Sequence, residues 1–195
     1  MTLTTYEGEA ITPYLSDLAD LRIRVFREWP YLYEGDRAYE EDYLKDFATA
    51  SHSLLILLRG AGEEIVGAST GAALTGHHDG FSAPFADYGY DPLTVFYCAE
   101  SVLLPPYRGK GWGHRFFDER EAHARRQDYA HCAFCAVIRD PDHPARPADY
   151  RPLDGFWRKR GYRPIEGLTA DFAWKDVGET EETTKSLQYW LKPLA

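Results

Sequence analysis

Apolar residues recur at helical spacing near the start of the chain. They lie three or four positions apart after Thr12-Pro13, a capping residue followed by proline, and this pattern predicts an amphipathic helix that ends before Pro30. Residues 39–48 mix apolar with acidic side chains and predict a second, shorter helix. Ahead of both helices, residues 3–6 could form a short strand.

Further along the chain, continuous apolar runs replace this spacing and predict buried strands. Residues 94–104 form the longest run, with Glu100 as its only charge, as expected for a central strand covered on both faces. The other predicted strands are 53–58, 65–74, 131–138, 172–174 and 187–191, and the other predicted helices are 112–129 and 153–160. This order predicts a single α/β domain over residues 1–195 with a mixed sheet, and residues 77–91 as an insertion over a site or a surface.

Composition narrows the function classes. The apolar fraction of 44% exceeds that of disordered chains, and no apolar run approaches the roughly 20 residues that would span a membrane. We expect a cytoplasmic protein, because the first residues also lack a basic segment followed by an apolar one. The net charge of −9 opposes binding to nucleic acid or an anionic membrane and favours a cationic or neutral substrate.

The three cysteines lie in apolar segments and are expected to be reduced core thiols. Cys132 and Cys135 would point to opposite faces of a strand, and this argues against a metal site. The cluster His77-His78-Asp79, in a glycine-rich loop, is expected to be solvated. The acidic residues near the second helix are expected to form a solvated face, or to line the entrance for a cationic amine: Glu34, Asp36, Glu40, Glu41 and Asp42.

The segment PPYRGKGWG, at residues 105–113, lies between the longest apolar run and a helix. Glycines let a backbone approach a ligand closely, and the first free N–H groups of a helix attract an anion, of which phosphate is the usual one. A Walker loop does not occur in the sequence, and a dinucleotide fingerprint would need glycine where His114 stands. The pattern that fits is R-x-x-G-x-G, as Arg108, Gly111 and Gly113.

This strand, loop and helix resemble the most recognisable motif of the GNAT N-acetyltransferases. The segment GFWRKRGY, at residues 155–162, is similar to the family's late helix with its aromatic-Gly-aromatic ending. The resemblance covers residues 94–163 closely and implies a central, mostly antiparallel mixed sheet flanked by helices. It also implies acetyl-coenzyme A as co-substrate, with no metal. Backbone groups of Leu103 and Leu104 would pair with the pantetheine arm, and the pyrophosphate would be held by Arg108, Gly109, Lys110, Gly111, Trp112 and Gly113.

The implied reaction moves an acetyl group to a primary amine of a small molecule or peptide, by direct attack on the thioester. Because an alkyl amine is protonated at neutral pH, a base or a water relay helps. Glu100 is the predicted base, since desolvation in an apolar strand should raise its pKa. The alternative for Glu100 is a buried ion pair, for instance with Arg139.

The proton donor is a second question. Many GNAT enzymes carry a tyrosine four residues before the glycine of the late helix, where this chain has Trp157, whose indole cannot protonate a thiolate. Tyr150 is preferred as its replacement, Tyr162 is an alternative, and the thiolate could also take its proton from water. Both tyrosines could instead be packing groups.

Other functions fit the same motif. A longer or acidic acyl group could be transferred, or the chain could be a coenzyme-A-binding sensor without catalysis, which Trp157 favours. An interaction domain without any nucleotide is a third possibility. The acceptor would be set by loops such as 77–91 and 140–152, and the final strands offer an edge for pairing in a homodimer.

Overall fold

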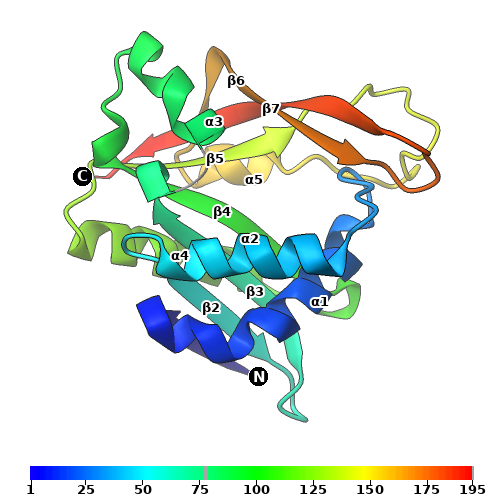
Figure 1. Cartoon of the computed structure of the whole chain (residues 1–195), viewed down its shortest axis with the longest axis horizontal. Coiled ribbons are helices and arrows are strands. Elements are labelled where there is room, and N and C mark those ends of the chain that lie inside the picture. The colour runs from blue at the N-terminus through cyan, green and yellow to red at the C-terminus, as the bar shows by residue number, and fades with distance from the viewer. Residues whose placement is uncertain (77–78, 195) are drawn as a thin grey trace.

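A computed structural model describes residues 1–76 and 79–194, and its centre is a seven-stranded sheet (Figure 1). The strand order is β1-β2-β3-β4-β5-β7-β6, and all neighbours are antiparallel except the parallel pair β4 and β5. The predicted mixed, mostly antiparallel sheet is therefore confirmed. The strands are β1 (Thr2–Glu7), β2 (Leu54–Arg59), β3 (Ile65–Ala73), β4 (Val95–Leu103), β5 (His131–Val137), β6 (Arg163–Lys175) and β7 (Glu182–Pro193).

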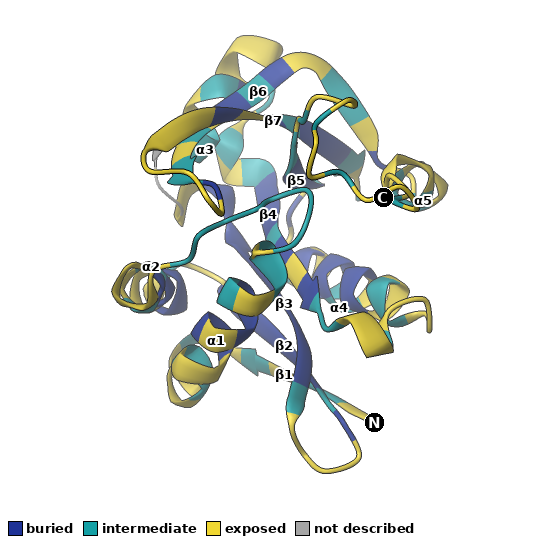
Figure 2. Cartoon of the chain, turned by 90° about the vertical axis from the view of Figure 1, so that its right-hand side faces the viewer, coloured by how far each residue is buried: buried dark blue, intermediate teal, exposed yellow. Residues whose placement is uncertain are grey.

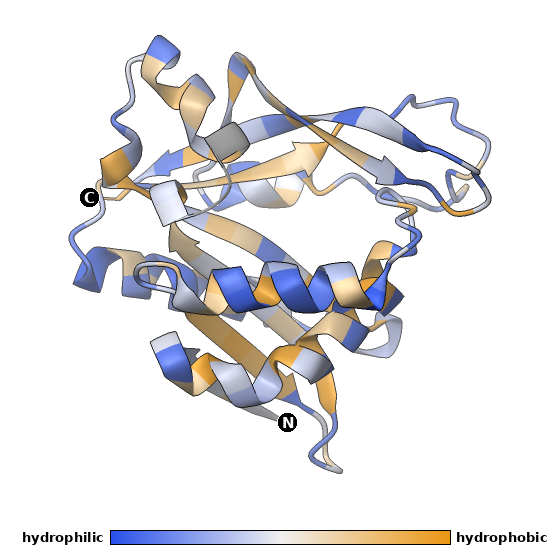
Figure 3. Ribbon diagram, viewed as in Figure 1, coloured by the Kyte–Doolittle hydropathy of each residue, from blue (hydrophilic) through white to orange (hydrophobic). Residues whose placement is uncertain are grey.

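Helices cover both faces of the sheet (Figure 2). The α-helices are α1 (Leu15–Phe26), α2 (Arg37–Thr49), α3 (Asp79–Ser82), α4 (Trp112–Arg126) and α5 (Asp154–Lys159). In β2, Leu55 and Leu57 pack toward α1 and α2, while Leu54, Ile56 and Leu58 pack toward α4. Because both faces of β2 are buried, its sequence is a continuous apolar run. Figure 3 shows the same contrast in hydropathy, with the central strands hydrophobic and α2 mostly hydrophilic.

The segment that follows β3 covers the sheet rather than an open site. Its described part contains α3 and a 3-10 helix, Ala83–Tyr88, and Phe85 is fully buried against the ring of Tyr189 in β7, with 4.9 Å between ring centroids. The predicted insertion therefore closes the face of β5 to β7, where it forms a third core cluster. His77 and His78 lie outside the described residues.

Two predicted boundaries were wrong at the N-terminal helix. Residues Gly8–Tyr14, including Pro13, form a 3-10 helix with Ile11 buried, and α1 begins only at Leu15. The helix ends at Phe26 because the chain turns there, and the Phe26 carbonyl accepts a hydrogen bond from the N–H of Tyr33. Residues 27–29, expected to be the last helical turn, consequently belong to a loop that runs to residue 36.

The strands β6 and β7 are longer than predicted. Pro164 and Gly167 interrupt the apolar pattern at the start of β6, and the ladder with β7 is irregular between Pro164 and Thr169. An edge strand tolerates such an interruption, because the missing N–H of proline can face away from its neighbour. The sequence pattern therefore predicted only residues 172–174, which lie within the regular part of β6.

The parallel strands β4 and β5 separate along their length. They pair only at Val95↔His131, Phe96↔Cys132 and Tyr97↔Ala133, although β4 runs on to Leu103. The register with β3 passes from Thr70↔Glu100 to Ala72↔Tyr97, so β4 carries one extra residue, a β-bulge, where the separation begins. Beyond the bulge, no described strand pairs with the β5-facing edge of β4.

None of the helices in the described part of the chain is both long and apolar enough to cross a membrane.

Candidate active site

The glycine loop joins the end of β4 to the start of α4. Gly109 and Gly111 have φ angles of 72° and 87°, in the left-handed region that glycine adopts without strain. Apart from each glycine and its two chain neighbours, no described atom lies within 4 Å of the position that a Cβ would take, so the loop is open to solvent at both points. Gly111 is the N-cap of α4, and the loop therefore delivers the chain directly into the helix N-terminus.

The amides of this loop are free to bind an anion. Within the described chain, no N–H from Gly109 to Gly113 donates to a backbone carbonyl or a side chain, whereas the next N–H, that of His114, bonds to the Gly111 carbonyl. The positive end of the α4 dipole lies at the same place, and Lys110 adds an exposed ammonium. The loop therefore presents free donors at a helix N-terminus, the groups that an anion would need.

The side chain of Arg108, in the glycine loop, contacts two other segments of the chain. Arg108 donates from Nε to the Leu103 carbonyl at 2.8 Å, and its Nη1 forms an exposed ion pair with Glu28 at 2.7 Å. The N–H of Leu104 donates to Val66 in β3 at 3.0 Å. Backbone groups that the resemblance assigned to the pantetheine arm thus have partners within the chain, which a ligand would share or replace.

Glu100 lies on β4 just past the bulge and is 8% exposed. Its Oε2 forms an ion pair with Nη1 of Arg22 in α1, at 2.6 Å, while its Oε1 is buried without a hydrogen-bond partner in the described chain. The alternative expectation for Glu100, a buried ion pair, is therefore confirmed, although the partner is Arg22. Arg139, the suggested partner, pairs instead with Asp176 at 2.6 Å. The backbone carbonyl of Glu100 accepts hydrogen bonds from Ser69 Oγ at 2.9 Å and from Arg120 Nη1 at 3.0 Å.

The same arginine also binds α2. Nε of Arg22 donates to Glu40 at 2.5 Å, and its guanidinium lies 4.7 Å from the ring centre of Tyr43. Glu40 is only 1% exposed, so the expectation of a solvated acidic face is wrong for this residue. Burial, followed by the negative charge of Glu100, raises the pKa of Tyr43, whose hydroxyl keeps its proton at neutral pH.

The other acidic residues near α2 have local roles. Asp36 accepts a hydrogen bond from the N–H of Tyr39 and caps the helix. Glu41 pairs with Arg37 at 2.9 Å, and Glu34 pairs with Arg27 at 3.0 Å, all of them at the surface.

Tyr150 lies in the loop between β5 and α5. Its ring is half-buried and edge-on to that of Trp29, with 5.9 Å between centroids, and the guanidinium of Arg146 lies 5.8 Å from its ring centre. Burial, then the nearby Asp154, raises the pKa of its hydroxyl. No contact joins Tyr150 directly to Glu100 in the described chain, although both lie close enough to Tyr31 to raise its pKa, after burial and Cys135.

The alternative aromatic residues belong to the core. Trp157 on α5 packs between Phe134 and Trp190, with ring centroids at 5.0 and 5.1 Å. Tyr162 is fully buried, and its hydroxyl donates to Glu121 at 3.3 Å. Tyr162 is therefore engaged in packing, whereas Tyr150 is only half-buried and remains the candidate.

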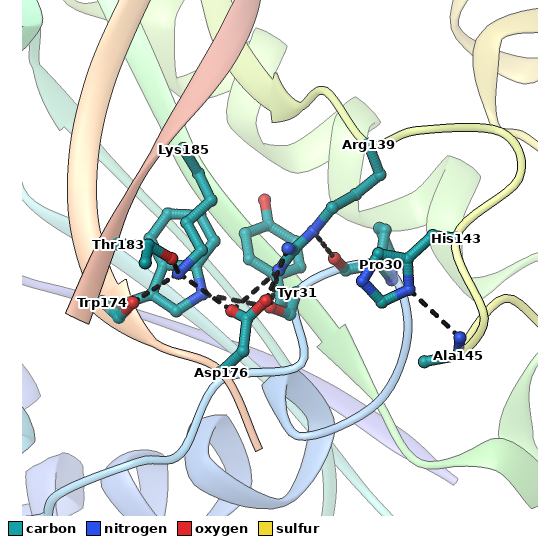
Figure 4. A network of polar contacts seen from close by, with 9 residues as sticks. All are labelled: Pro30, Tyr31, Arg139, His143, Ala145, Trp174, Asp176, Thr183 and Lys185. Atoms are coloured by element: carbon teal, nitrogen blue, oxygen red, sulfur yellow. Dashed lines mark hydrogen bonds and ion pairs between the residues drawn. The ribbon is translucent and has the colours of Figure 1, made fainter. Parts of the chain in front are cut away.

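The loop of residues 27–36 is fastened to the end of the sheet by a buried ion network (Figure 4). Arg139 donates to both Asp176 oxygens, at 2.6 and 3.0 Å, and to the Pro30 carbonyl at 2.8 Å. Lys185 reaches Asp176 from the other side at 3.0 Å, and Trp174 Nε1 donates to the Tyr31 carbonyl at 3.1 Å. Sequence reasoning missed this network, since its members come from distant segments without a shared motif.

Burial alone would raise the pKa of Asp176. The hydrogen bonds from Arg139 and Lys185 outweigh burial and hold this pKa below its usual value. Asp176 is therefore ionised at neutral pH. Through Arg139, which also donates to the Pro30 carbonyl, it fastens the loop of residues 27–36.

The cysteines are all free and buried. Cys132 packs in the core beneath α4 and Cys135 in the core with β7, so the prediction that they point to opposite faces is confirmed. Among residues 1–76 and 79–194, no cluster of three or more His, Cys, Asp or Glu side chains is placed to bind a metal.

Comparison with known proteins bears on the fold. No protein-family model matches the chain, and no curated protein sequence matches it. Among solved structures, the chain is similar to a ribosomal-protein-alanine N-acetyltransferase from Brucella melitensis, with a TM-score of 0.59, 13% identity, and coverage of 98% of this chain and 99% of that one. A GNAT-family acetyltransferase from Staphylococcus aureus Mu50 gives a TM-score of 0.58 and 12% identity, with both chains fully covered.

A third similar structure contains a ligand. It is a GNAT phosphinothricin acetyltransferase from Sinorhizobium meliloti in complex with acetyl-coenzyme A, with a TM-score of 0.58 and 14% identity, covering 100% of this chain and 90% of that one. Identities this low show a shared fold.

Proposed function

Because this chain has the fold of the GNAT acetyltransferases, we propose that it is an N-acetyltransferase that uses acetyl-coenzyme A. The observation that carries the proposal is the row of unpaired amides from Gly109 to Gly113 at the N-terminus of α4. A pyrophosphate seated there would satisfy these donors and interact favourably with the helix dipole and Lys110. The acetyl-coenzyme A complex of one similar structure supports the choice of ligand.

The separation of β4 from β5 supports the rest of the binding mode. The pantetheine arm contains two amide groups, and the β5-facing edge of β4 beyond the bulge offers backbone groups that no described strand pairs. An arm that runs from the glycine loop past Leu104 and Leu103 would pair there like an added strand. It would bring the thioester toward the bulge, near Glu100.

The acceptor is proposed to be a primary amine of a small molecule or peptide. Acetyl-coenzyme A supplies the activated acetyl group. The amine nitrogen forms a bond to the thioester carbonyl carbon, the carbon–sulfur bond breaks, and the nitrogen gives up a proton. We assign that proton to Glu100, directly or through one water, since its Oε1 is buried with no other partner in the described chain.

Tyr150 is proposed to protonate the departing thiolate. A tyrosine hydroxyl is protonated at neutral pH, and burial raises the pKa of Tyr150 further, so the proton is in place for donation. Trp157 cannot fill this role, because an indole N–H is not acidic enough, and its ring packs in the core. A Tyr150→Phe variant should therefore lose turnover while it still binds the coenzyme.

A catalytically silent coenzyme-A-binding module is the second candidate, favoured by Trp157 at the usual tyrosine position. A thiol-release assay with a panel of primary amines separates the two functions. Our proposal expects release of coenzyme A that depends on at least one amine. Binding of the coenzyme without release in the presence of any amine would favour the silent module, and a longer acyl donor is tested in the same assay by exchanging the thioester.

A further inference from the structure

Three charged side chains from different elements meet in the interior beside β4. Arg22 of α1 lies between Glu40 of α2 and Glu100 of β4, with Nε on Glu40 and Nη1 on Glu100. The side chains are 10%, 1% and 6% exposed. Both carboxylates pair with the one guanidinium, so the cluster carries a formal net charge of −1, an arrangement that burial makes costly.

The geometry of Arg22 is fixed on every side. Its planar guanidinium uses one edge for each carboxylate and lies 4.7 Å from the ring centre of Tyr43 and 5.1 Å from that of Phe26. A guanidinium held in this way cannot swing from one carboxylate to the other. The Oε2 atom of Glu100 is therefore held in place, while its Oε1 stays buried and unpartnered in the described chain.

The main chain of Glu100 is fixed as well. Its carbonyl accepts hydrogen bonds from Ser69 in β3 and Arg120 in α4, so neither the backbone nor the carboxylate can move independently. Arg120 is a further buried cation near Glu100, and it donates to the backbone carbonyl of Glu100. The hydroxyls of Tyr31 and Tyr43 also lie near this carboxylate: burial, Cys135 and then Glu100 raise the pKa of Tyr31, and burial and then Glu100 raise that of Tyr43. The unpartnered Oε1 of Glu100 therefore has capacity for another donor.

We propose that Arg22, anchored by Glu40, is a positioning residue for acetyl transfer: it holds Oε2 of Glu100 so that Oε1 meets the incoming amine. The inference rests on the proposed function and narrows its acceptor to amines that arrive protonated, as alkyl amines do at neutral pH. An ammonium group supplies the cation that the cluster lacks. The ammonium first gives one proton to Oε1, which frees the nitrogen lone pair for attack on the thioester carbonyl carbon. As the carbon–sulfur bond breaks, the thiolate takes a proton from Tyr150, and the second proton of the nitrogen restores that of Tyr150 through water.

The test is a double-mutant cycle on turnover. Arg22→Lys keeps the buried positive charge but cannot bind two carboxylates through a planar fork. We expect it to lower kcat roughly tenfold to a hundredfold while the KM for acetyl-coenzyme A stays unchanged. In a Glu100→Gln background the same substitution should have no further effect, because Arg22 acts through Glu100. The matched control is Arg24→Lys, an exposed arginine on the same helix, which should leave kcat unchanged.

Two results would overturn the inference while leaving the proposed function intact. One is a wild-type kcat in Arg22→Lys. The other is an equal loss of kcat in the wild-type and Glu100→Gln backgrounds, which would mean that Arg22 acts on the fold alone. If Arg22→Lys does not fold, Glu40→Gln replaces it as the test variant. Glu40→Gln removes the carboxylate that anchors Arg22 but leaves the positive charge of Arg22 beside Glu100. An unchanged kcat in this variant would also overturn the inference. Absence of amine-dependent turnover in the wild type would overturn the proposed function and this inference together.

Discussion

Gly111 is the residue on which the anion site depends most directly. Its φ of 87° strains any other residue, and its amide belongs to the unpaired row at the start of α4. We expect Gly111→Ala to cost about 1 kcal/mol in the free energy of unfolding and to weaken acetyl-coenzyme A binding in isothermal titration calorimetry. Gly89→Ala is the matched control, because Gly89 has a φ of 77° and an equally open surrounding, but lies in another loop.

Gly89→Ala should show the same loss of stability with unchanged coenzyme affinity. If both variants bound the coenzyme as the wild type does, the loop amides would not be the pyrophosphate site.

Glu100→Gln tests the assignment of the base. Without a base, the rate depends on the small fraction of free amine, which falls as the pH falls. We expect turnover to drop roughly a hundredfold, with the largest loss at low pH, in a pH profile of kcat/KM. A rate that matches the wild type at every pH would remove Glu100 from the mechanism.

At the residue scale, sequence reasoning located single positions better than partnerships. Glu100 was conspicuous as the one charge in an apolar strand, and the glycine spacing exposed Gly111. Arg22 carried no signal, because its partners come from α2 and β4 and only the packed sheet brings them together. The partners in such long-range ion pairs depend on how distant segments pack together, and the periodicity of the sequence gives no information on that packing.

Among the elements, the loop of residues 27–36 depends most on distant partners. Replacing Asp176 with Asn would leave Arg139 and Lys185 buried without their counter-charge. We expect a loss of about 3 kcal/mol in the free energy of unfolding at pH 7, measured by chemical denaturation.

This loss should shrink in acid. Since the folded protein holds the pKa of Asp176 below its usual value, the unfolded chain takes up the proton first as the pH falls. The stabilisation by the carboxylate is complete above about pH 4 and disappears as the pH falls through the lower pKa of the folded state. A difference between wild type and Asp176→Asn that stayed constant down to about pH 2 would contradict this account of the network.

The type and order of the predicted strands and longer helices were confirmed, while their ends were less predictable. The helix expected from Thr12 was shortened at both ends, since local capping signals compete with the burial of Ile11 and with the turn after Phe26. Most of β6 escaped notice because Pro164 and Gly167 interrupt its pattern, and only its edge position makes them tolerable.

At the scale of the whole molecule, the opening between β4 and β5 is the feature that the proposed function requires. It arises where a bulge in β4 meets the single parallel junction of the sheet, and neither could be predicted from the sequence alone. Strand pairing joins segments far apart in the chain, so the order β4-β5-β7-β6 becomes known only with the three-dimensional fold.

Hydrogen–deuterium exchange can follow this opening. We expect amides within residues 98–103 that face β5 to exchange faster than those paired with β3, and to become protected when acetyl-coenzyme A is added. Amides of β2 should keep the same rate and serve as the internal control. Protection confined to other strands would place the ligand elsewhere.

The proposed function depends above all on the binding of the coenzyme A pyrophosphate by the amides of the glycine loop. Calorimetric titration of the purified protein tests this binding most directly. We predict saturable heat with both coenzyme A and acetyl-coenzyme A, lost or weakened in Gly111→Ala and retained in Gly89→Ala. No heat with either ligand at any concentration up to the millimolar range would contradict the account.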